Sequence, residues 1–164
     1  MADQRCSIAA VVVLLFLLVG IGHAQTETIT PKETLAHWAE AWQSGSVEKC
    51  LTFYHDSKSL FAVASSGHSY RGLAGVRRMY AAAFDEATWE RVALKDLEIQ
   101  ENGNVAWGKC RFVADFTPSE STVQFVFTSQ GTFVLLKVGA DWKIAMEHFS
   151  PIVDVPRVQR RKDR

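Results

Sequence analysis

The 164-residue sequence predicts an α+β fold, a cone in which three N-terminal helices pack on a curved, mainly antiparallel β-sheet. Two observations favour this class. In the first half of the chain, apolar residues recur three and four positions apart, which is typical of amphipathic helices. In the second half they alternate with polar residues between glycine-containing turns, which is typical of antiparallel strands. Laying the helices on one face of the sheet is the simplest packing of the two halves.

Composition and charge are ordinary for one globular domain. Hydrophobic residues make up 48% of the chain and charged residues 22%, with 18 basic and 18 acidic side chains. Because the charges balance, no long-range field attracts a polyanion, so we expect no nucleic-acid partner.

The N-terminus predicts export. An uncharged apolar run over residues 8–21 is followed by Gly22-His23-Ala24, a small-x-small cleavage pattern. The alternative is a membrane anchor, but a bilayer span needs about 20 apolar residues and this run is shorter. We therefore expect residues 1–24 to be a signal peptide cleaved near Ala24, a periplasmic or secreted mature protein, and no stable membrane insertion.

The remaining chain divides into one domain and a tail. Residues 25–155 carry the helical and strand patterns, whereas residues 156–164 are basic and have no apolar period. We expect this tail to be a flexible, solvated end. A nucleic-acid arm or a tether to an anionic surface is the alternative.

Three helices are predicted from capping residues and spacing. Thr30-Pro31-Lys32-Glu33 is a strong helix start, and Trp38 lies on the apolar stripe that follows it. A short helix begins after Ser46 and places Tyr54 inward, and a third follows Gly72 and places Tyr80 inward. A brief apolar strand over residues 60–64 separates the last two.

Four strands follow as an antiparallel meander. The segments are residues 92–101, 106–116, 122–138 and 142–150. Asn102-Gly103 predicts a two-residue hairpin turn, which would set Asp96 opposite Lys109. Gly131 interrupts the long third segment, where we expect a bulge.

No metal or cofactor site is predicted. The chain has no CxxC, no HExxH and no cluster of His and Cys at ligand spacing. Cys50 and Cys110 would be two buried thiols, or a disulfide in an oxidising compartment.

Alternation along the last strand provides a candidate site. It sets Trp142, Ile144, Met146 and His148 on one inward face, with Glu147 on the other. Pairing across the Gly139 turn then places Thr132 opposite His148, and Gln130 opposite Ser150. A few polar groups at the end of an apolar face are typical of a ligand pocket.

His148 is the candidate acid or base of this pocket, because histidine titrates near neutral pH. The alternative is a core histidine that holds the end of the sheet in register. Tyr54 and Tyr80 would offer phenol donors to a ligand, and Trp38 would form a wall, unless all three are plain core residues.

The opposite sheet face predicts a homodimer. Its apolar residues are Phe125, Phe127, Phe133, Leu135 and Phe149. So apolar a face is not expected to meet water, and a second copy would cover it. Curvature that turns part of this face inward is the competing explanation.

Short motifs in this order resemble the NTF2-like superfamily, and within it the SnoaL-like and ketosteroid-isomerase-like domains. They are Trp38-Ala39-Glu40-Ala41-Trp42 before Ser44-Gly45, Phe53-Tyr54-His55-Asp56, Arg71-Gly72, Ala106-Trp107, Asp141-Trp142-Lys143-Ile144 and His148-Phe149-Ser150. The resemblance implies a cone with a small hydrophobic ligand at its open end, and pairing through the sheet. It also argues against steroid isomerisation, because Trp38 and Ala62 fall where that reaction's tyrosine and general-base aspartate would stand.

Three functions therefore stay open at this point. The first is an exported protein that binds a small, mostly apolar molecule, with His148 as polar anchor. The second is an isomerase, cyclase or lyase that uses His148 for proton transfer, helped by Tyr54 or Tyr80. The third is a dimeric assembly module whose cone is filled by side chains. The scaffold alone does not choose among them.

Overall fold

The computed structural model describes residues 29–152, so the predicted signal peptide and the whole predicted basic tail, residues 156–164, lie outside the described residues. The helices are α1 (Pro31–Gln43), α2 (Val47–Leu51) and α3 (Gly72–Glu86). The strands are β1 (Phe61–Val63), β2 (Ser69–Arg71), β3 (Ala87–Asn102), β4 (Val105–Pro118), β5 (Phe125–Val138) and β6 (Asp141–Pro151). Within this range no helix is long and apolar enough to cross a membrane.

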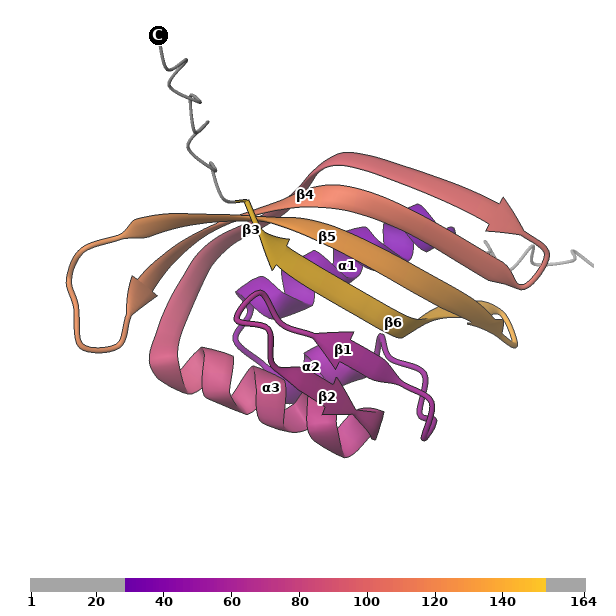
Figure 1. The fold of residues 1–164 in the computed structure, drawn as a ribbon, viewed down its shortest axis with the longest axis horizontal. Helices are drawn as coiled ribbons and strands as arrows, with labels where there is room; N and C mark the ends of the chain where they lie inside the picture. The colour runs from indigo at the N-terminus through magenta and orange to yellow at the C-terminus, as the bar shows by residue number, and fades with distance from the viewer. Residues whose placement is uncertain (1–28, 153–164) are drawn as a thin grey trace, which may run out of the picture.

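One six-stranded sheet in the order β2-β1-β6-β5-β4-β3 forms the framework. Every neighbouring pair is antiparallel except β1 with β6. The sheet bends around the helices, which lie on its concave side (Figure 1). The predicted α+β cone is confirmed, and so is the meander from β3 to β6. The sequence did not predict β2, whose three residues precede α3.

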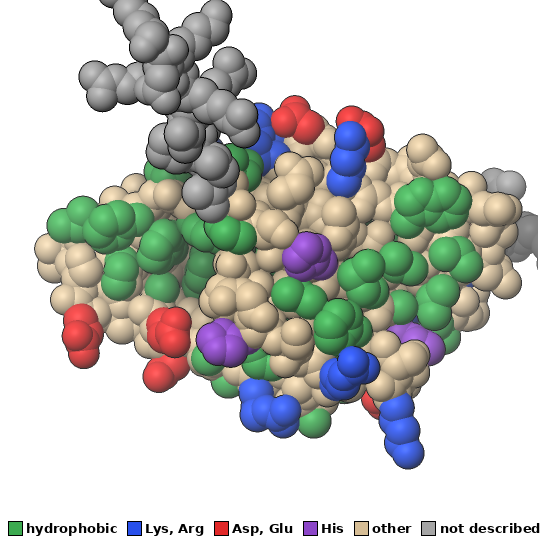
Figure 2. All heavy atoms as spheres, in the orientation of Figure 1, with side chains coloured by type: hydrophobic (Ala, Val, Ile, Leu, Met, Phe, Trp, Pro, Cys, Tyr) green, Lys and Arg blue, Asp and Glu red, His purple; other side chains and the backbone are tan. Residues whose placement is uncertain are grey.

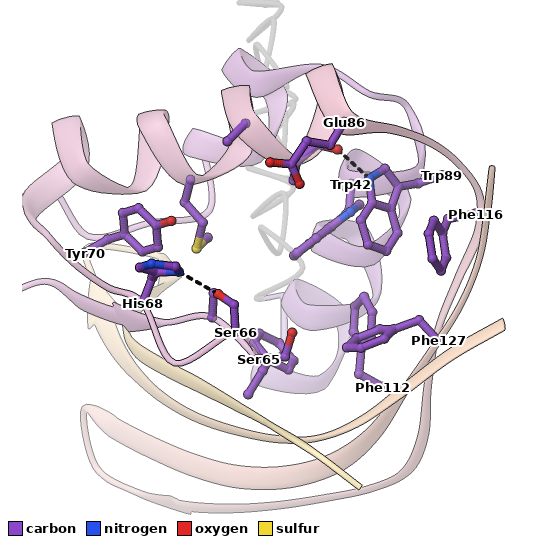
Figure 3. Close-up of a pocket in the computed structure, with 15 residues that line it drawn as sticks. Trp42, Ser65, Ser66, His68, Tyr70, Glu86, Trp89, Phe112, Phe116 and Phe127 are labelled. Carbon is purple, nitrogen blue, oxygen red and sulfur yellow. Dashed lines mark hydrogen bonds between the residues drawn. The ribbon is translucent and has the colours of Figure 1, made fainter. Parts of the chain in front are cut away.

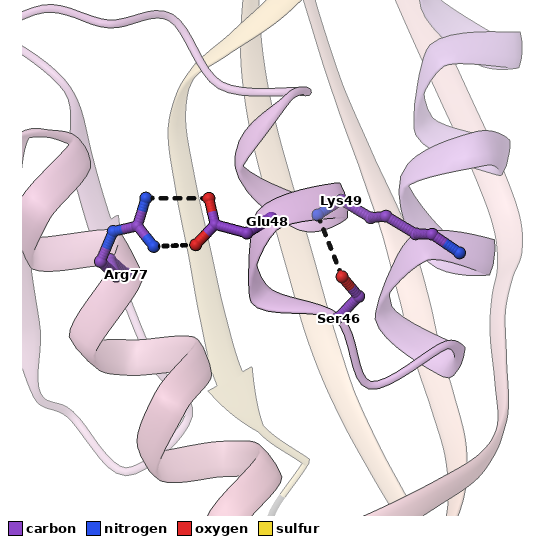
Figure 4. Close-up of polar contacts among 4 residues, drawn as sticks. All are labelled: Ser46, Glu48, Lys49 and Arg77. Atoms are coloured by element: carbon purple, nitrogen blue, oxygen red, sulfur yellow. Dashed lines mark hydrogen bonds and ion pairs between the residues drawn. The ribbon is translucent and has the colours of Figure 1, made fainter.

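Helix starts follow the predicted capping chemistry. The Thr30 side chain accepts a hydrogen bond from the Glu33 amide at 3.2 Å, and the Thr30 amide donates to the Glu33 carboxylate at 2.8 Å. The Ser46 side chain caps α2 with a single hydrogen bond, which it accepts from the Lys49 amide at 3.3 Å (Figure 4). The Arg77 guanidinium of α3 donates to both carboxylate oxygens of Glu48 on α2. This pair is exposed, so it orients the two helices more than it stabilises them.

The β3–β4 hairpin corrects one predicted register. Asn102 pairs with Val105, so Gly103 and Asn104 form the turn, with Gly103 at φ +60°. A positive φ at the first central position is what a type II′ turn requires. Lys109 therefore lies opposite Glu98, not Asp96.

A bulge in β3 then gives Asp96 a different partner. The register shifts between Lys95 and Glu98, and Asp96 takes a left-handed φ of 53°. Its carboxylate accepts from Arg111 at 2.9 Å. Opposite charges do face each other across the ladder, but the irregular backbone changes which ones.

Gly131 has a different role from the one expected. It pairs regularly with Cys110 and Phe149, without a bulge. A Cβ atom at Gly131 would lie 2.8 Å from the Phe149 ring and 3.0 Å from the Cys110 sulfur. The position needs glycine because the Phe149 ring crosses directly over the backbone.

The bulge of this sheet region lies in β6 instead. Val134 pairs with Met146, and the next residue, Leu135, pairs with Ile144, which leaves Ala145 without a partner. Because one residue is inserted here, the strand residues that point inward are even-numbered before the bulge and odd-numbered after it. Trp142 and Ile144 point inward before it, and Glu147 and Phe149 point inward after it.

The face expected to form a dimer is consequently mostly internal. Phe133, Leu135 and Phe149 are buried under the helices, Phe127 is half-buried, and Phe125 is exposed. The competing explanation, curvature that turns this face inward, is correct for the buried three. Both Cys50 and Cys110 are free and buried.

Candidate functional site

A pocket of about 440 Å³ opens at one end of the cone, between α3, the β1–β2 turn and the concave side of β4 and β5 (Figure 3). Its lining is mainly apolar and comes from segments far apart in the sequence. The lining residues are Trp42, Ala64, Ser65, Ser66, His68, Tyr70, Met79, Ala82, Ala83, Glu86, Trp89, Phe112, Phe116, Phe127 and Phe149.

Aromatic rings form its floor and one wall. The Trp42 ring contacts Trp89 edge to face, with centroids 5.4 Å apart, and lies 5.3 Å from Phe112. Trp89 in turn stacks on Phe116 at 5.4 Å. The Trp89 indole N–H donates to the Ala83 carbonyl at 3.0 Å, which fixes that ring against α3. Rings that support one another in this way present a preformed apolar surface to a ligand.

Polar groups are confined to the rim. The His68 Nδ1 lies 3.0 Å from the Ser66 hydroxyl on the β1–β2 turn. Glu86 ends α3 and projects toward the hollow from the other side (Figure 3). Few polar groups around an apolar hollow can orient a ligand without making the site hydrophilic.

A buried acid lies deeper in the cone. Glu147 is fully buried, and its Oε2 accepts a hydrogen bond from the Tyr54 hydroxyl at 2.7 Å. Tyr54 and Tyr80 share a hydrogen bond of 2.7 Å, and the Trp38 indole N–H lies 2.8 Å from the Tyr80 oxygen. A tyrosine hydroxyl has a single proton to donate, and Tyr54 donates it to Glu147. Tyr80 is therefore the donor in the hydrogen bond between the two tyrosines. Donors therefore run from Trp38 through both tyrosines to the carboxylate.

Burial perturbs the titration of this network. Loss of hydration raises the pKa of Glu147 from an ordinary 4.5 to about 7, and the Tyr54 hydrogen bond opposes the rise. Burial and the nearby carboxylate raise the pKa values of Tyr54 and Tyr80 well above 10. The Oε1 of Glu147 has no partner among the described residues. Glu147 can therefore gain or lose a proton near neutral pH.

Aromatic packing separates this acid from the pocket. The Trp42 ring lines the pocket, and its centroid lies 5.4 Å from that of Trp38 and 5.1 Å from that of Tyr80. Phe149 stacks on Trp38 with ring centroids 6.2 Å apart, and it also lines the pocket. Glu147 is therefore connected to the pocket wall through Tyr54, Tyr80 and Trp42, and it does not line the pocket itself.

Comparison with protein families is decisive for the identity of the fold. The family model described as the SnoaL-like domain matches residues 32–154. The chain belongs to the SnoaL-like domain family. A comparison with curated protein sequences finds no significant match.

Solved structures show which proteins share the fold of this SnoaL-like domain. A ketosteroid isomerase-like protein from Erwinia carotovora atroseptica is similar with a TM-score of 0.66 at 15% identity, over 79% of this chain and 98% of that one. A candidate dehydratase of the NTF2-like family from Streptomyces avermitilis gives 0.64 at 18% identity, over 73% and 92%.

A third similar structure belongs to a protein named as an association domain and not as an enzyme. It is a candidate calcium/calmodulin-dependent protein kinase type II association domain from Thiobacillus denitrificans, with a TM-score of 0.63 at 15% identity, over 76% and 96%. At these identities the likeness shows the fold of the SnoaL-like domain and leaves its activity open.

His148 does not face the interior of the SnoaL-like domain. It is exposed on the convex side of β6, where its Nε2 lies 3.0 Å from the Ser150 hydroxyl. The predicted pairing of Thr132 with His148 is confirmed, and so is that of Gln130 with Ser150. The predicted inward face is wrong because the bulge at Ala145 reverses the alternation before His148 is reached.

The other predicted site residues divide between the two faces of the sheet. Thr132 pairs with His148, and the Ser150 hydroxyl lies 3.0 Å from its ring, so both are on the face of His148 and outside the cone. Trp38, Tyr54 and Tyr80 are all buried and meet around Glu147, and none of them lines the pocket. Sequence reasoning missed Glu147, which it assigned to the outer face. Phe149 could have signalled the change, since an aromatic residue out of phase with Trp142 and Ile144 is typical of a shifted register.

Proposed function

We propose that this chain is an exported SnoaL-like protein that binds a small, mostly apolar molecule in the open end of its cone. The observation that carries the proposal is the hollow of about 440 Å³ lined largely by aromatic side chains. That volume lies within the range of about 300 to 1,000 Å³ that small-molecule sites occupy. His148 has no part in this binding, because its ring is on the other side of the sheet.

Filling the pocket tests the proposal. Ala83 lines it, whereas Ala81 is exposed on the same helix and does not. Ala83→Phe places a ring in the hollow, and Ala81→Phe adds the same ring to the surface. We expect wild type and Ala81→Phe to retain compounds from a metabolite extract, detected by native mass spectrometry, and Ala83→Phe to lose them.

Equal retention by the filled variant would place binding elsewhere and contradict the proposal. Failure of all three proteins to retain any compound would also contradict it. Circular dichroism spectra of the variants show whether each has kept the fold.

An isomerase, cyclase or lyase remains the second candidate, and the buried acid favours it. Glu147 combines a pKa near 7 with a hydrogen-bonded tyrosine, the pairing that general acid–base chemistry uses. In this enzyme hypothesis the proton-transfer group is Glu147, whereas the sequence had suggested His148 for that role. A substrate would have to displace Trp42 or Phe149 to reach it.

Turnover separates the catalyst from the binder. If the protein is an enzyme, a product that forms in the metabolite extract with wild type should disappear with Glu147→Gln and Tyr54→Phe. Ligand retention should survive both substitutions, because neither residue lines the pocket. Retention without any product in all proteins would leave binding as the function.

A homodimer through the convex sheet face is the third element of the proposal. Trp107 is 43% exposed and Val105 37% exposed, and Val134 and Met146 lie in the same cross-strand row as Trp107. Figure 2 shows several hydrophobic side chains on the half of the viewed face that carries the β3–β4 and β5–β6 turns. An exposed tryptophan among aliphatic neighbours is typical of an interface centre.

Sedimentation tests the dimer. Trp107→Lys should convert it to a monomer, whereas Glu101→Lys changes the other side of the same hairpin and should leave it intact. A wild-type protein that sediments as a monomer at every concentration would contradict this element.

A further inference from the structure

We infer that the pocket prefers a lipophilic amine: a flat apolar body carrying a positively charged nitrogen, with that nitrogen beside Glu86. The inference rests on the proposed small-molecule function and specifies its ligand class. It follows from the charges, the rings and the rim groups that surround the hollow.

The charge distribution of the lining is one-sided. Of the fifteen lining residues, Glu86 alone carries a carboxylate, and none is Lys or Arg. Within residues 29–152, Glu86 forms no ion pair or side-chain hydrogen bond, whereas the exposed Glu48 and the half-buried Asp115 are both paired with arginines. The Glu86 charge is therefore available to a ligand.

The aromatic walls favour the same sign of charge. The faces of Trp and Phe rings are electronegative and attract cations, most strongly when water is excluded. Trp89 follows Glu86 by three residues, and its ring is fixed by the Ala83 carbonyl. Trp89 stacks on Phe116, and both rings line the same pocket as the Glu86 carboxylate. A cation at this place meets both kinds of attraction at once.

The other polar groups of the rim can accept or donate hydrogen bonds, but none of them is a lysine or arginine that would stabilise a bound anion. Ser65 and Ser66 offer hydroxyls, and the His68 ring is already bonded to Ser66 through Nδ1. A carboxylate or phosphate ligand would meet the repulsion of Glu86 without a lysine or arginine to offset it. The lining thus disfavours anions and favours an ammonium group.

Three probes of matched size test the preference. Naphthylethylamine, naphthylethanol and naphthylacetate share one ring system and differ in charge. Their dissociation constants for the purified full-length protein are measured by isothermal titration calorimetry at pH 7.5. We expect the amine to bind about tenfold more tightly than the alcohol and the acetate to bind more weakly than both.

Two variants assign the effect to Glu86. Glu86→Gln should reduce the affinity for the amine to that for the alcohol, and Glu86→Lys should reverse the preference toward the acetate. Asp85→Asn removes the same charge one residue earlier, outside the lining, and should leave the amine preference unchanged. Both positions are exposed, so folding is not at risk.

The measurements distinguish failure of the amine preference from failure of the proposed small-molecule binding. If the alcohol binds as tightly as the amine, or if Glu86→Gln keeps the preference, the amine class is wrong and the pocket remains a binding site. If none of the three probes binds, and the metabolite extract also yields no retained compound, the proposed function fails together with the inference.

Discussion

Replacing the buried acid by its neutral isostere, Glu147→Gln, should flatten the dependence of stability on pH. The pKa of Glu147 is about 7 in the folded protein against an ordinary 4.5, a difference that corresponds to about 3 kcal/mol. A raised pKa means that the folded state holds the proton more tightly than the unfolded chain. This contribution is fully present below pH 4.5 and is lost as pH rises through 7.

Urea denaturation followed by tryptophan fluorescence at pH 5, 6, 7 and 8 measures the effect. About 2 to 3 kcal/mol of the loss should fall between pH 5 and pH 8 in the wild type and be absent in Glu147→Gln. Glu101→Gln, an exposed acid of β3, is the control and should follow the wild type. The reasoning is refuted if wild type and Glu147→Gln lose stability equally over this range.

Three further predictions follow from single contacts. Tyr54→Phe removes the only hydrogen bond to the buried carboxylate among the described residues, so the pKa of that carboxyl should rise above about 7 in a ¹³C NMR titration; a fall would contradict the network. Gly131→Ala should press on the Phe149 ring and cost about 1 to 3 kcal/mol of unfolding free energy; an unchanged urea midpoint would contradict the close packing. Burial raises the pKa of both Cys50 and Cys110 to about 12, so Ellman's reagent should label them only after unfolding, and rapid labelling of the native protein would show that they are accessible.

The helical half was predictable because its signals are local. The capping box at Thr30 and the three-four spacing of apolar residues depend only on near neighbours, and α1 begins where they indicate. The meander followed from turn residues and alternation, which are also local. Burial of Tyr54 and Tyr80 was predictable for the same reason, but their meeting with Glu147 depends on how α2, α3 and β6 pack.

Errors arose where one backbone irregularity changes many positions. The bulge at Ala145 exchanges the two faces of β6, so it moves His148 outward and Glu147 inward together. The bulge could not be predicted from the residue at which it occurs, since Ala145 is compatible with a regular strand. The rim of the pocket was equally hidden, because the position of His68 is set by the small β1–β2 hairpin, which the sequence did not indicate.

A crystal structure of the protein grown with naphthylethylamine tests the pocket most directly. The ligand-binding account predicts the naphthyl ring between Trp42, Trp89 and Phe112, with its nitrogen near the Glu86 carboxylate. A compound bound on the convex face, or a hollow closed by its own aromatic side chains, would contradict it.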